Sequence, residues 1–238
     1  MRSLLVVVSL FAICGFSAHP PDRLGTLEIV IEPRFSGRAL VLGNQLYRSS
    51  TGDSLYMDAC RFYLCSVQLK GKNGVFAEKE SYHLVDAEEP ASQIIVLKNV
   101  PAGRYQSLCF QVGTDSLTNI AGAMGGDLDP TRGMYWAWNT GYINVKMEGR
   151  SNSCPTRQHA FEFHIGGYMP PHQTVRNIEL PLKNAVLRNN RTTIVRINAD
   201  LSQFFSRVSL TQTHSVMIPS RTAVQLADYF KAVFSVHP

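Results

Sequence analysis

Hydrophobic and polar residues alternate along most of this chain in short runs that are separated by turn-forming residues. The run Thr26–Pro33 alternates and ends at a proline, and the long run Ala59–Lys70 closes at Asn73-Gly74, a dipeptide typical of hairpins. Other apolar or alternating runs are Gly37–Leu46, Tyr82–Asp86, Gln93–Leu97, Ser107–Val112, Tyr142–Met147, His159–Ile165, Val175–Leu182 and Thr192–Asp200. About eight to ten short strands with regular turns predict an all-β fold, an antiparallel β-sandwich.

Two segments depart from this alternation. Near the C-terminus Ser220 can cap a helix, because the apolar residues that follow it recur on one helical face. The sequence therefore predicts one short C-terminal helix. The other segment, Gly113–Gly133, is polar, rich in glycine and without periodicity, and it directly precedes both tryptophans. Long loops on rigid β scaffolds frequently carry function, and the small apolar residues here favour an ordered loop.

The N-terminus has the composition of a targeting segment. Arg2 supplies a positively charged end, and Leu4–Ile13 form an apolar stretch that is too short for a membrane anchor. Gly15–Ala18 supply the small residues that are typical of the end of a signal peptide. We therefore expect residues 1–18 to be a signal peptide and residues 24–238 to form a single domain. The expected location is the periplasm, or the outer membrane or cell surface. Cys14 leaves a second interpretation open, a lipoprotein signal with a lipid anchor at that cysteine.

Charge and cysteine content narrow the function further. The formal net charge is +5 with 17% charged residues and no cluster of lysine and arginine, so we expect no nucleic-acid binding. Beyond the leader we expect no transmembrane span. Four cysteines follow the leader, and in an oxidising compartment they permit two disulfides. Cys60 and Cys65 are five positions apart, so on one strand they face opposite sides and do not pair with each other.

Both tryptophans lie in the stretch Gly133–Tyr142. Alternation on a strand places Trp136 and Trp138 on one face together with Met134, and the three side chains form a large, oxidisable surface. Two interpretations stay open at this point. The three side chains either fill an aromatic part of the core or form the wall of a site.

Histidines are the residues of this chain best suited to bind a metal. His164 lies on the strand face opposite Phe161 and Phe163, and His83 and His214 flank polar turns. A lone histidine is usually a hydrogen-bonded structural residue, whereas several that converge in an exported protein indicate copper, zinc, iron or nickel.

The long loop carries three carboxylates, Asp115, Asp127 and Asp129. Such residues bind calcium or cap turns, and the missing EF-hand spacing favours capping. The sequence contains neither a Gly-x-Ser-x-Gly elbow nor a glycine-rich phosphate loop. We therefore expect the protein not to be an enzyme.

Several segments together resemble the MbnP family, which is named for a periplasmic protein associated with methanobactin. They are Tyr82–Asp86, Val100–Tyr105, Phe110–Asp115, Leu128–Pro130 with Gly133–Tyr142, Lys146–Gly149 and Phe163–Gly167. The two most specific are the tryptophan-containing string and Phe-His-Ile-Gly-Gly, and the pattern is similar to the branch common in Bacteroidetes.

The resemblance implies an exported β-sandwich with a copper site built from histidines and a tryptophan oxidised to kynurenine. A partner dihaem peroxidase of the MbnH type performs that oxidation. Carried onto this chain, the resemblance makes Trp136 or Trp138 the oxidised residue. It makes His164 the best-matched copper ligand, followed by His83 and His214.

The chain departs from the copper-binding branch of the family at one place. An Asn-His pair is expected in the loop before the tryptophans, and here Asn119 is followed by Ile120. Two hypotheses from different classes follow. The first is an exported copper-binding protein with a modifiable tryptophan, and the second is an exported interaction module that keeps the fold without the metal.

Overall fold

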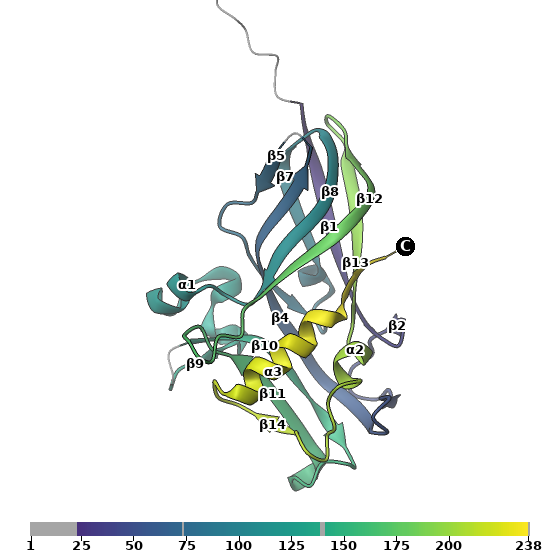
Figure 1. Ribbon diagram of the computed structural model, residues 1–238, viewed down its shortest axis with the longest axis vertical. Coiled ribbons are helices and arrows are strands. Elements are labelled where there is room, and N and C mark those ends of the chain that lie inside the picture. Colours follow the sequence, from purple (N-terminus) through teal and green to yellow (C-terminus); the bar gives the residue numbers. More distant parts are fainter. Residues whose placement is uncertain (1–22, 73, 139–140, 238) are drawn as a thin grey trace, which may run out of the picture.

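Two β-sheets that face each other make up most of the structure (Figure 1). The computed structural model describes residues 23–72, 74–138 and 141–237. The signal peptide expected at residues 1–18 and the candidate lipid-anchor residue Cys14 lie outside the described residues. Within those described ranges, no helix is both long enough and apolar enough to cross a membrane.

The smaller sheet is built on the N-terminal strand. Its strands are β1 (Leu24–Phe35), β2 (Arg38–Ala39), β7 (Ile94–Pro101), β13 (Thr192–Asp200) and β15 (Phe234–Val236). The order is β15-β13-β1-β2, with β7 also paired to β1. β1 and β13 run parallel from the pair Thr26 and Thr192 to the pair Arg34 and Asp200. The sandwich is therefore not antiparallel throughout, a feature that alternation cannot predict because it indicates faces and not strand direction.

The larger sheet is organised around the long strand β4. Its strands are β3 (Tyr47–Arg48), β4 (Ser54–Gly71), β5 (Gly74–Ala77), β6 (Tyr82–Asp86), β8 (Gly103–Val112), β9 (Tyr135–Trp136), β10 (Gly141–Ser151), β11 (Ala160–Gly166), β12 (Arg176–Leu187) and β14 (Ser215–Val216). The order is β12-β8-β4-β10-β11-β14, while β3, β5 and β6 also pair with β4, and β9 with β10. β5 turns back antiparallel onto the end of β4, as the hairpin signal predicted.

The predicted β-rich fold with a short C-terminal helix is confirmed. The helix is α3 (Arg221–Phe230), and Ser220 caps it, because its hydroxyl accepts a hydrogen bond from the Ala223 amide at 3.1 Å. In Figure 1 α3 crosses in front of β10 and β11. Its buried residues, among them Leu226 and Phe230, belong to the main core, so the helix closes that end of the sandwich.

Three details differ from the sequence prediction. α1 (Ser116–Ala121) lies inside the segment predicted to be a loop, and α2 (Ser202–Phe205) follows β13. Both helices are too short to show a helical period in the sequence. The apolar stretch Gly37–Leu46 forms a strand only at Arg38–Ala39.

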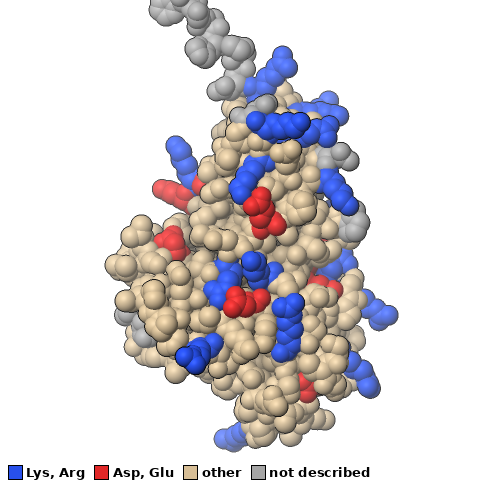
Figure 2. Space-filling view, viewed as in Figure 1, with Lys and Arg blue, Asp and Glu red and all other residues tan. Residues whose placement is uncertain are grey.

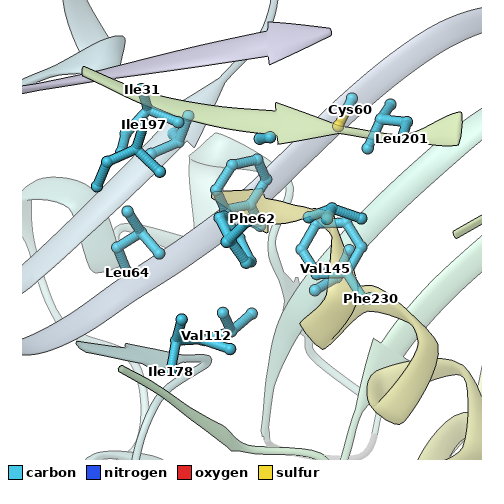
Figure 3. Packing of buried hydrophobic residues seen from close by; sticks show 14 of the residues in the cluster. Ile31, Cys60, Phe62, Leu64, Val112, Val145, Ile178, Ile197, Leu201 and Phe230 are labelled. Atoms are coloured by element: carbon cyan, nitrogen blue, oxygen red, sulfur yellow. The ribbon is translucent and has the colours of Figure 1, made fainter. Parts of the chain in front are cut away.

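The main core lies between the two sheets (Figure 3). Ile31 and Ile197 of the smaller sheet and Phe62 and Leu64 of β4 are almost wholly buried there. The Phe62 ring stands edge-on to Phe230 of α3, with 5.4 Å between the ring centroids. Each fully buried side chain of this kind stabilises the fold by roughly 1.5–3 kcal/mol. The main core thus covers one face of the larger sheet. The other face of that sheet is available for a second layer of packed side chains.

The four cysteines of the described chain are free thiols, so the two disulfides that the sequence permits are not formed. Cys60 belongs to the main core and Cys65 to a cluster on the opposite side of the larger sheet, which confirms that they face opposite sides of β4. Burial raises the pKa of Cys60 to about 12 and that of Cys154 to about 11. Both thiols are therefore protonated and unreactive near neutral pH.

Candidate functional site around Trp136

A second hydrophobic cluster covers the outer face of the larger sheet, away from the main core. We call it the outer cluster, and its buried members are Tyr63, Cys65, Leu84, Leu128, Met134, Trp136, Tyr142 and Ile143. The segment that holds α1 folds across this face and is tied to it by phenol hydroxyls. Tyr63 donates to the Asp127 carbonyl at 3.0 Å, and Tyr142 donates to the Leu128 carbonyl at 3.1 Å. The predicted loop is therefore an ordered cover.

Asn144 anchors two loops to this face. The pairing of β10 with β11 is irregular between Ile143 and Val145, and Asn144 lies there, 2% exposed. Its Oδ1 accepts from the Thr114 amide at 3.0 Å, and its Nδ2 donates to Thr174 Oγ1 at 2.9 Å. Thr114 begins the segment with α1, and Thr174 ends the loop after β11. One buried amide with its hydrogen bonds made thus positions both loops.

Asn119 joins α1 to β10. Its Nδ2 donates to the Asp115 carbonyl at 2.8 Å and its Oδ1 accepts from the Tyr142 amide at 2.8 Å. The neighbouring Ile120 is 69% exposed. Ile120 therefore presents an apolar side chain at the surface of α1.

Trp136 lies against the backbone of β11. Gly166 has no side chain, and a Cβ added there would come within 2.6 Å of Trp136 Cζ3. The indole is 5% exposed, and its Nε1 is buried without a hydrogen-bond partner among the described residues. A buried donor left unpaired costs about 1–3 kcal/mol. Such groups are rare in folded proteins and are often kept for a functional reason.

The three side chains predicted to share a face differ strongly in exposure. Met134 is fully buried in the outer cluster, whereas Trp138 is 65% exposed. The Trp136 and Trp138 ring centroids are 5.8 Å apart and the rings are inclined by 45°. Met134 therefore fits the interpretation that these side chains fill part of the core. Trp138 fits the interpretation that they form the wall of a site. Trp136 lies between them, buried but in contact with the exposed indole.

His164 lies on the same face of β11 as Gly166, against which the Trp136 ring packs. Phe161 and Phe163 are in the main core, as predicted, and His164 points the other way, two residues before Gly166. His164 Nε2 is 2.7 Å from Glu148 Oε1, and Lys146 Nζ is 3.2 Å from the same oxygen. The imidazole is thus held by a carboxylate partner, an arrangement that also orients metal-binding histidines.

His83 is not part of this site. Its Nε2 is 2.7 Å from Glu78 Oε2, and its register pairs it with Leu64, a residue of the main core. His83 therefore faces the side of the sheet opposite to Trp136. β4 and β10 also separate β6 from β11, which puts His83 roughly 14 Å or more from His164. The structure therefore does not bring His83 together with His164.

His214 also lies apart from His164. It precedes β14 at the edge of the larger sheet, where its carbonyl accepts from the Glu162 amide at 2.8 Å. Alternation places its side chain with Val216, which packs in the main core. Its Nδ1 is buried and has no hydrogen-bond partner in the described part of the chain. Among the described residues, no three His, Cys, Asp or Glu side chains are grouped as a metal site would require. Two of the carboxylates of the long loop act as caps, because Asp115 caps α1 and Asp129 accepts from the Thr131 amide at 2.8 Å. The third, Asp127, accepts from the Leu84 amide of β6 at 3.0 Å.

An open pocket of about 210 Å³ adjoins Trp136. Its lining residues are Trp136, Gly141, Tyr142, Gly167, Tyr168, Met169, Pro170, His172 and Pro219. Most of them come from the loop between β11 and β12. The sequence pattern placed a turn there but indicated no site.

The family model for MbnP matches residues 24–218, from the start of β1 to just after β14. This chain belongs to the MbnP family. A solved structure, MbnP from Methylosinus trichosporium, is similar with a TM-score of 0.56 and 15% sequence identity, over 79% of this chain and 80% of that chain. At this identity the likeness shows the fold. No curated protein matches the chain.

The MbnP match includes the whole outer cluster and every residue that lines the pocket beside it except Pro219. Of the residues predicted for an MbnP-type site, the structure brings Trp136, Trp138 and His164 to one face. Sequence reasoning missed Asn144, Met169 and His172. Asn144 gave a weak signal, because a polar residue inside the strand-like run Tyr142–Met147 can mark a bulge.

Acid should weaken the fold through Glu148. The hydrogen bond from His164, together with the Lys146 ammonium, lowers the pKa of Glu148 to about 2 against the opposing effect of burial. A carboxyl whose pKa is lower in the folded state than in the unfolded state stabilises the fold at pH values above its unfolded pKa of about 4.3. This stabilisation is lost as the pH falls towards the folded pKa. Allowing for partial exposure, we expect about 1–2 kcal/mol of stability to be lost between about pH 5 and about pH 2.

Urea unfolding across that pH window tests this expectation. Glu148→Gln should flatten the fall in unfolding free energy. Glu162→Gln is the matched control, because Glu162 is exposed and lies directly opposite Glu148 in the register. An unchanged slope in Glu148→Gln would show that the ion pair contributes nothing to stability.

Proposed function

We propose that this protein is an exported copper-binding member of the MbnP family whose site lies on the outer face beside Trp136. One observation carries the proposal: a buried indole lies over Gly166, on the face of β11 that also carries His164, and its ring adjoins the exposed ring of Trp138. Its Nε1 has no hydrogen-bond partner among the described residues. The described residues supply too few conventional ligands for copper around His164. A ligand made from tryptophan would fill part of that deficit.

Indole itself is a poor metal ligand, because its nitrogen lone pair belongs to the aromatic system. Opening the pyrrole ring inserts two oxygen atoms across its C2–C3 bond. Hydrolysis by one water molecule then releases the formyl group as formate and leaves kynurenine, with an aromatic amine and a ketone that can both coordinate. The oxygen atoms come from peroxide or dioxygen, and the oxidant in this proposal is a dihaem peroxidase of the MbnH type. Together with the imidazole of His164, the amine gives a set of nitrogen ligands, which suits copper.

The two tryptophans have different roles in this proposal. Trp136 is too deeply buried for direct contact with a protein oxidant, whereas Trp138 is largely exposed. An electron removed from Trp138 can be replaced from Trp136 across the ring contact of 5.8 Å between centroids. Trp138 is thus the relay and Trp136 the residue that is opened.

Protein purified from the native host tests both roles. We expect the peptide that contains Trp136 to carry the mass gain of kynurenine, and protein made in a host without the peroxidase to carry none. Trp138→Phe should reduce the modification of Trp136, because the relay is lost. Trp136→Phe should abolish the modification and lower the copper content.

Peptide mass spectrometry and metal analysis of the same samples provide the readout. Two intact tryptophans and no copper in native material, with the peroxidase present, would reject the proposal.

A second candidate function is an interaction module, and the surface around the site favours it. The segment that holds α1 and β9 forms a lobe on the outer face. Large apolar side chains are exposed on and near this lobe: Leu117, Ile120, Met124, Trp138 and Met169. Figure 2 shows that the lobe with α1 and β9 carries few charged side chains on this face. Contiguous apolar surface of this kind often marks a protein interface. Copper-free native protein with both tryptophans intact would favour this function over the first.

A further inference from the structure

Five cationic side chains gather at the end of the sandwich where β1 begins. We call this end the basic tip, and its members, all exposed, are Arg23, Lys72, Arg104, Arg188 and Arg191. Figure 2 shows lysine and arginine side chains crowding this upper end of the molecule. The five residues come from four segments that are far apart in the chain. The sequence therefore shows no basic run here, and only the fold produces this charged surface.

The strand register brings the four segments together. Gly71, at the end of β4, pairs with Gly74 of β5 and with Tyr105 of β8. Gly103, at the start of β8, pairs with Leu187, at the end of β12. The turns that follow β4, precede β8 and follow β12 thus lie at the same end of the larger sheet, and one or two of the five cations lie at each turn.

The start of β1 is fixed between two of these turns. The Ala102 amide donates to the Arg23 carbonyl at 2.6 Å, and the Asn190 amide donates to the Leu24 carbonyl at 2.8 Å. The chain that precedes Arg23, which includes the expected leader, therefore joins the domain at the basic tip. In the lipoprotein interpretation of the leader, the lipid on Cys14 is tethered to this end. A membrane next to the N-terminus is thus next to the five cations.

Acidic side chains do not balance the charge of the basic tip. No Asp or Glu lies in its four segments, which are residues 23–25, 71–74, 101–104 and 187–192. Glu28 comes five residues after Arg23 on β1, which is roughly 16 Å along the strand. Exposed charges are screened over about 8 Å at physiological ionic strength, so Glu28 has little effect at the tip. Glu179 is already paired, because its Oε2 is 2.8 Å from Lys70 Nζ.

An apolar side chain stands among these cations. Val75 is 61% exposed and follows the turn that carries Lys72. Val75 and Arg104 line the same open hollow of about 120 Å³. An exposed apolar residue within a basic surface is typical of proteins that bind the membrane interface, where phosphate groups adjoin acyl chains. A nucleic acid also presents phosphates, but it has no acyl layer that Val75 can enter.

We propose that the basic tip binds the surface of a membrane that contains anionic phospholipids, with Val75 entering the interface. Arginine and lysine bind phosphate oxygens through charge-assisted hydrogen bonds, and clusters of about four to eight of them are typical of sites for anionic lipids. The lobe with α1 and β9 lies away from the tip, so it faces the solution when the tip is bound (Figure 1). The inference goes beyond the proposed copper function and does not depend on it.

Sedimentation with lipid vesicles tests the proposal on the mature chain that begins after residue 18 and therefore lacks Cys14. This chain should bind vesicles of phosphatidylcholine mixed with phosphatidylglycerol, and it should not bind vesicles of phosphatidylcholine alone. Arg188→Gln combined with Arg191→Gln should weaken binding by about tenfold or more, because each cation near the lipid surface contributes. Arg38→Gln combined with Arg48→Gln is the matched control and should bind as the wild type does. These two residues are exposed at the opposite end of the sandwich, beside the end of β1 and the start of β4.

A second pair of variants tests the apolar contact. Val75→Ser should weaken vesicle binding by about fivefold, because less apolar area enters the interface. Val41→Ser is its control, since Val41 is 51% exposed and lies near Arg38, far from the tip. Thermal melts of all these variants should stay close to the wild type, because the substituted side chains are exposed.

The outcomes decide between a membrane and other partners. Weaker binding in the Arg188–Arg191 and Val75 variants, with both controls unchanged, would support the proposal. Equal binding to both kinds of vesicle, no binding to either, or equal weakening in the Arg38–Arg48 control would overturn it. A DNA duplex bound as tightly as the anionic vesicles, with no effect of Val75→Ser, would also overturn it in favour of a general polyanion surface. Copper content should be the same in every variant, so a failure here leaves the copper proposal standing.

Discussion

Adding one methyl group at Gly166 is expected to displace the Trp136 ring and lower the free energy of unfolding by about 3 kcal/mol. The new Cβ would lie 2.6 Å from Trp136 Cζ3 and 2.7 Å from the Tyr142 carbonyl oxygen, closer than van der Waals contact allows. The carbonyl belongs to β10 and cannot move without loss of strand pairing. The indole must therefore leave its place against β11.

The matched control is Gly103→Ala in β8, where an added Cβ would have no neighbour within 4 Å. Urea unfolding gives the free energies of both variants. Fluorescence in a Trp138→Phe background reports Trp136 separately, because the chain has two tryptophans. Gly166→Ala should shift that emission to the red as the ring gains water. A Gly166→Ala protein with wild-type stability and emission would mean that the indole does not lie against this backbone.

Asn144→Ala should also cost about 3 kcal/mol, and it should loosen both loops of the site. The substitution leaves the Thr114 amide without its buried acceptor and removes the donor to Thr174. Each buried polar group left unpaired costs about 1–3 kcal/mol. Each loop is anchored to the sheet through one of these two threonines. Trp136 and the Met169–His172 turn should therefore lose their fixed positions together.

Hydrogen exchange and urea unfolding test this second expectation. The amides of Thr114 and Thr174 should exchange faster in Asn144→Ala, while those of β1 and β13 stay protected. Asn177→Ala on β12 is the control, because Asn177 is exposed, and it should change stability by less than about 0.5 kcal/mol. Unchanged exchange at both threonines would show that the loops are held by other contacts.

Local sequence determined much of the fold. β6 and β13 begin and end at the predicted residues, and Ser220 caps α3 as expected. These features depend on short-range rules: a strand shows its period of two, and a helix shows its cap. The same rule placed Cys60 and Cys65 on opposite faces of β4, and His164 opposite Phe161.

The tertiary structure decided which faces meet. Alternation assigns His83 and His164 to strands but does not indicate which strands are neighbours or which face is covered, so it could not separate the two histidines. The parallel pairing of β1 with β13 joins segments far apart in the chain, and no local pattern indicates it. Met169 and His172 share a pocket with Trp136 because long-range hydrogen bonds, such as that from Asn144 to Thr174, tie their loop to β10. Such long-range hydrogen bonds and packing form after the local elements and leave no periodic signal in the sequence.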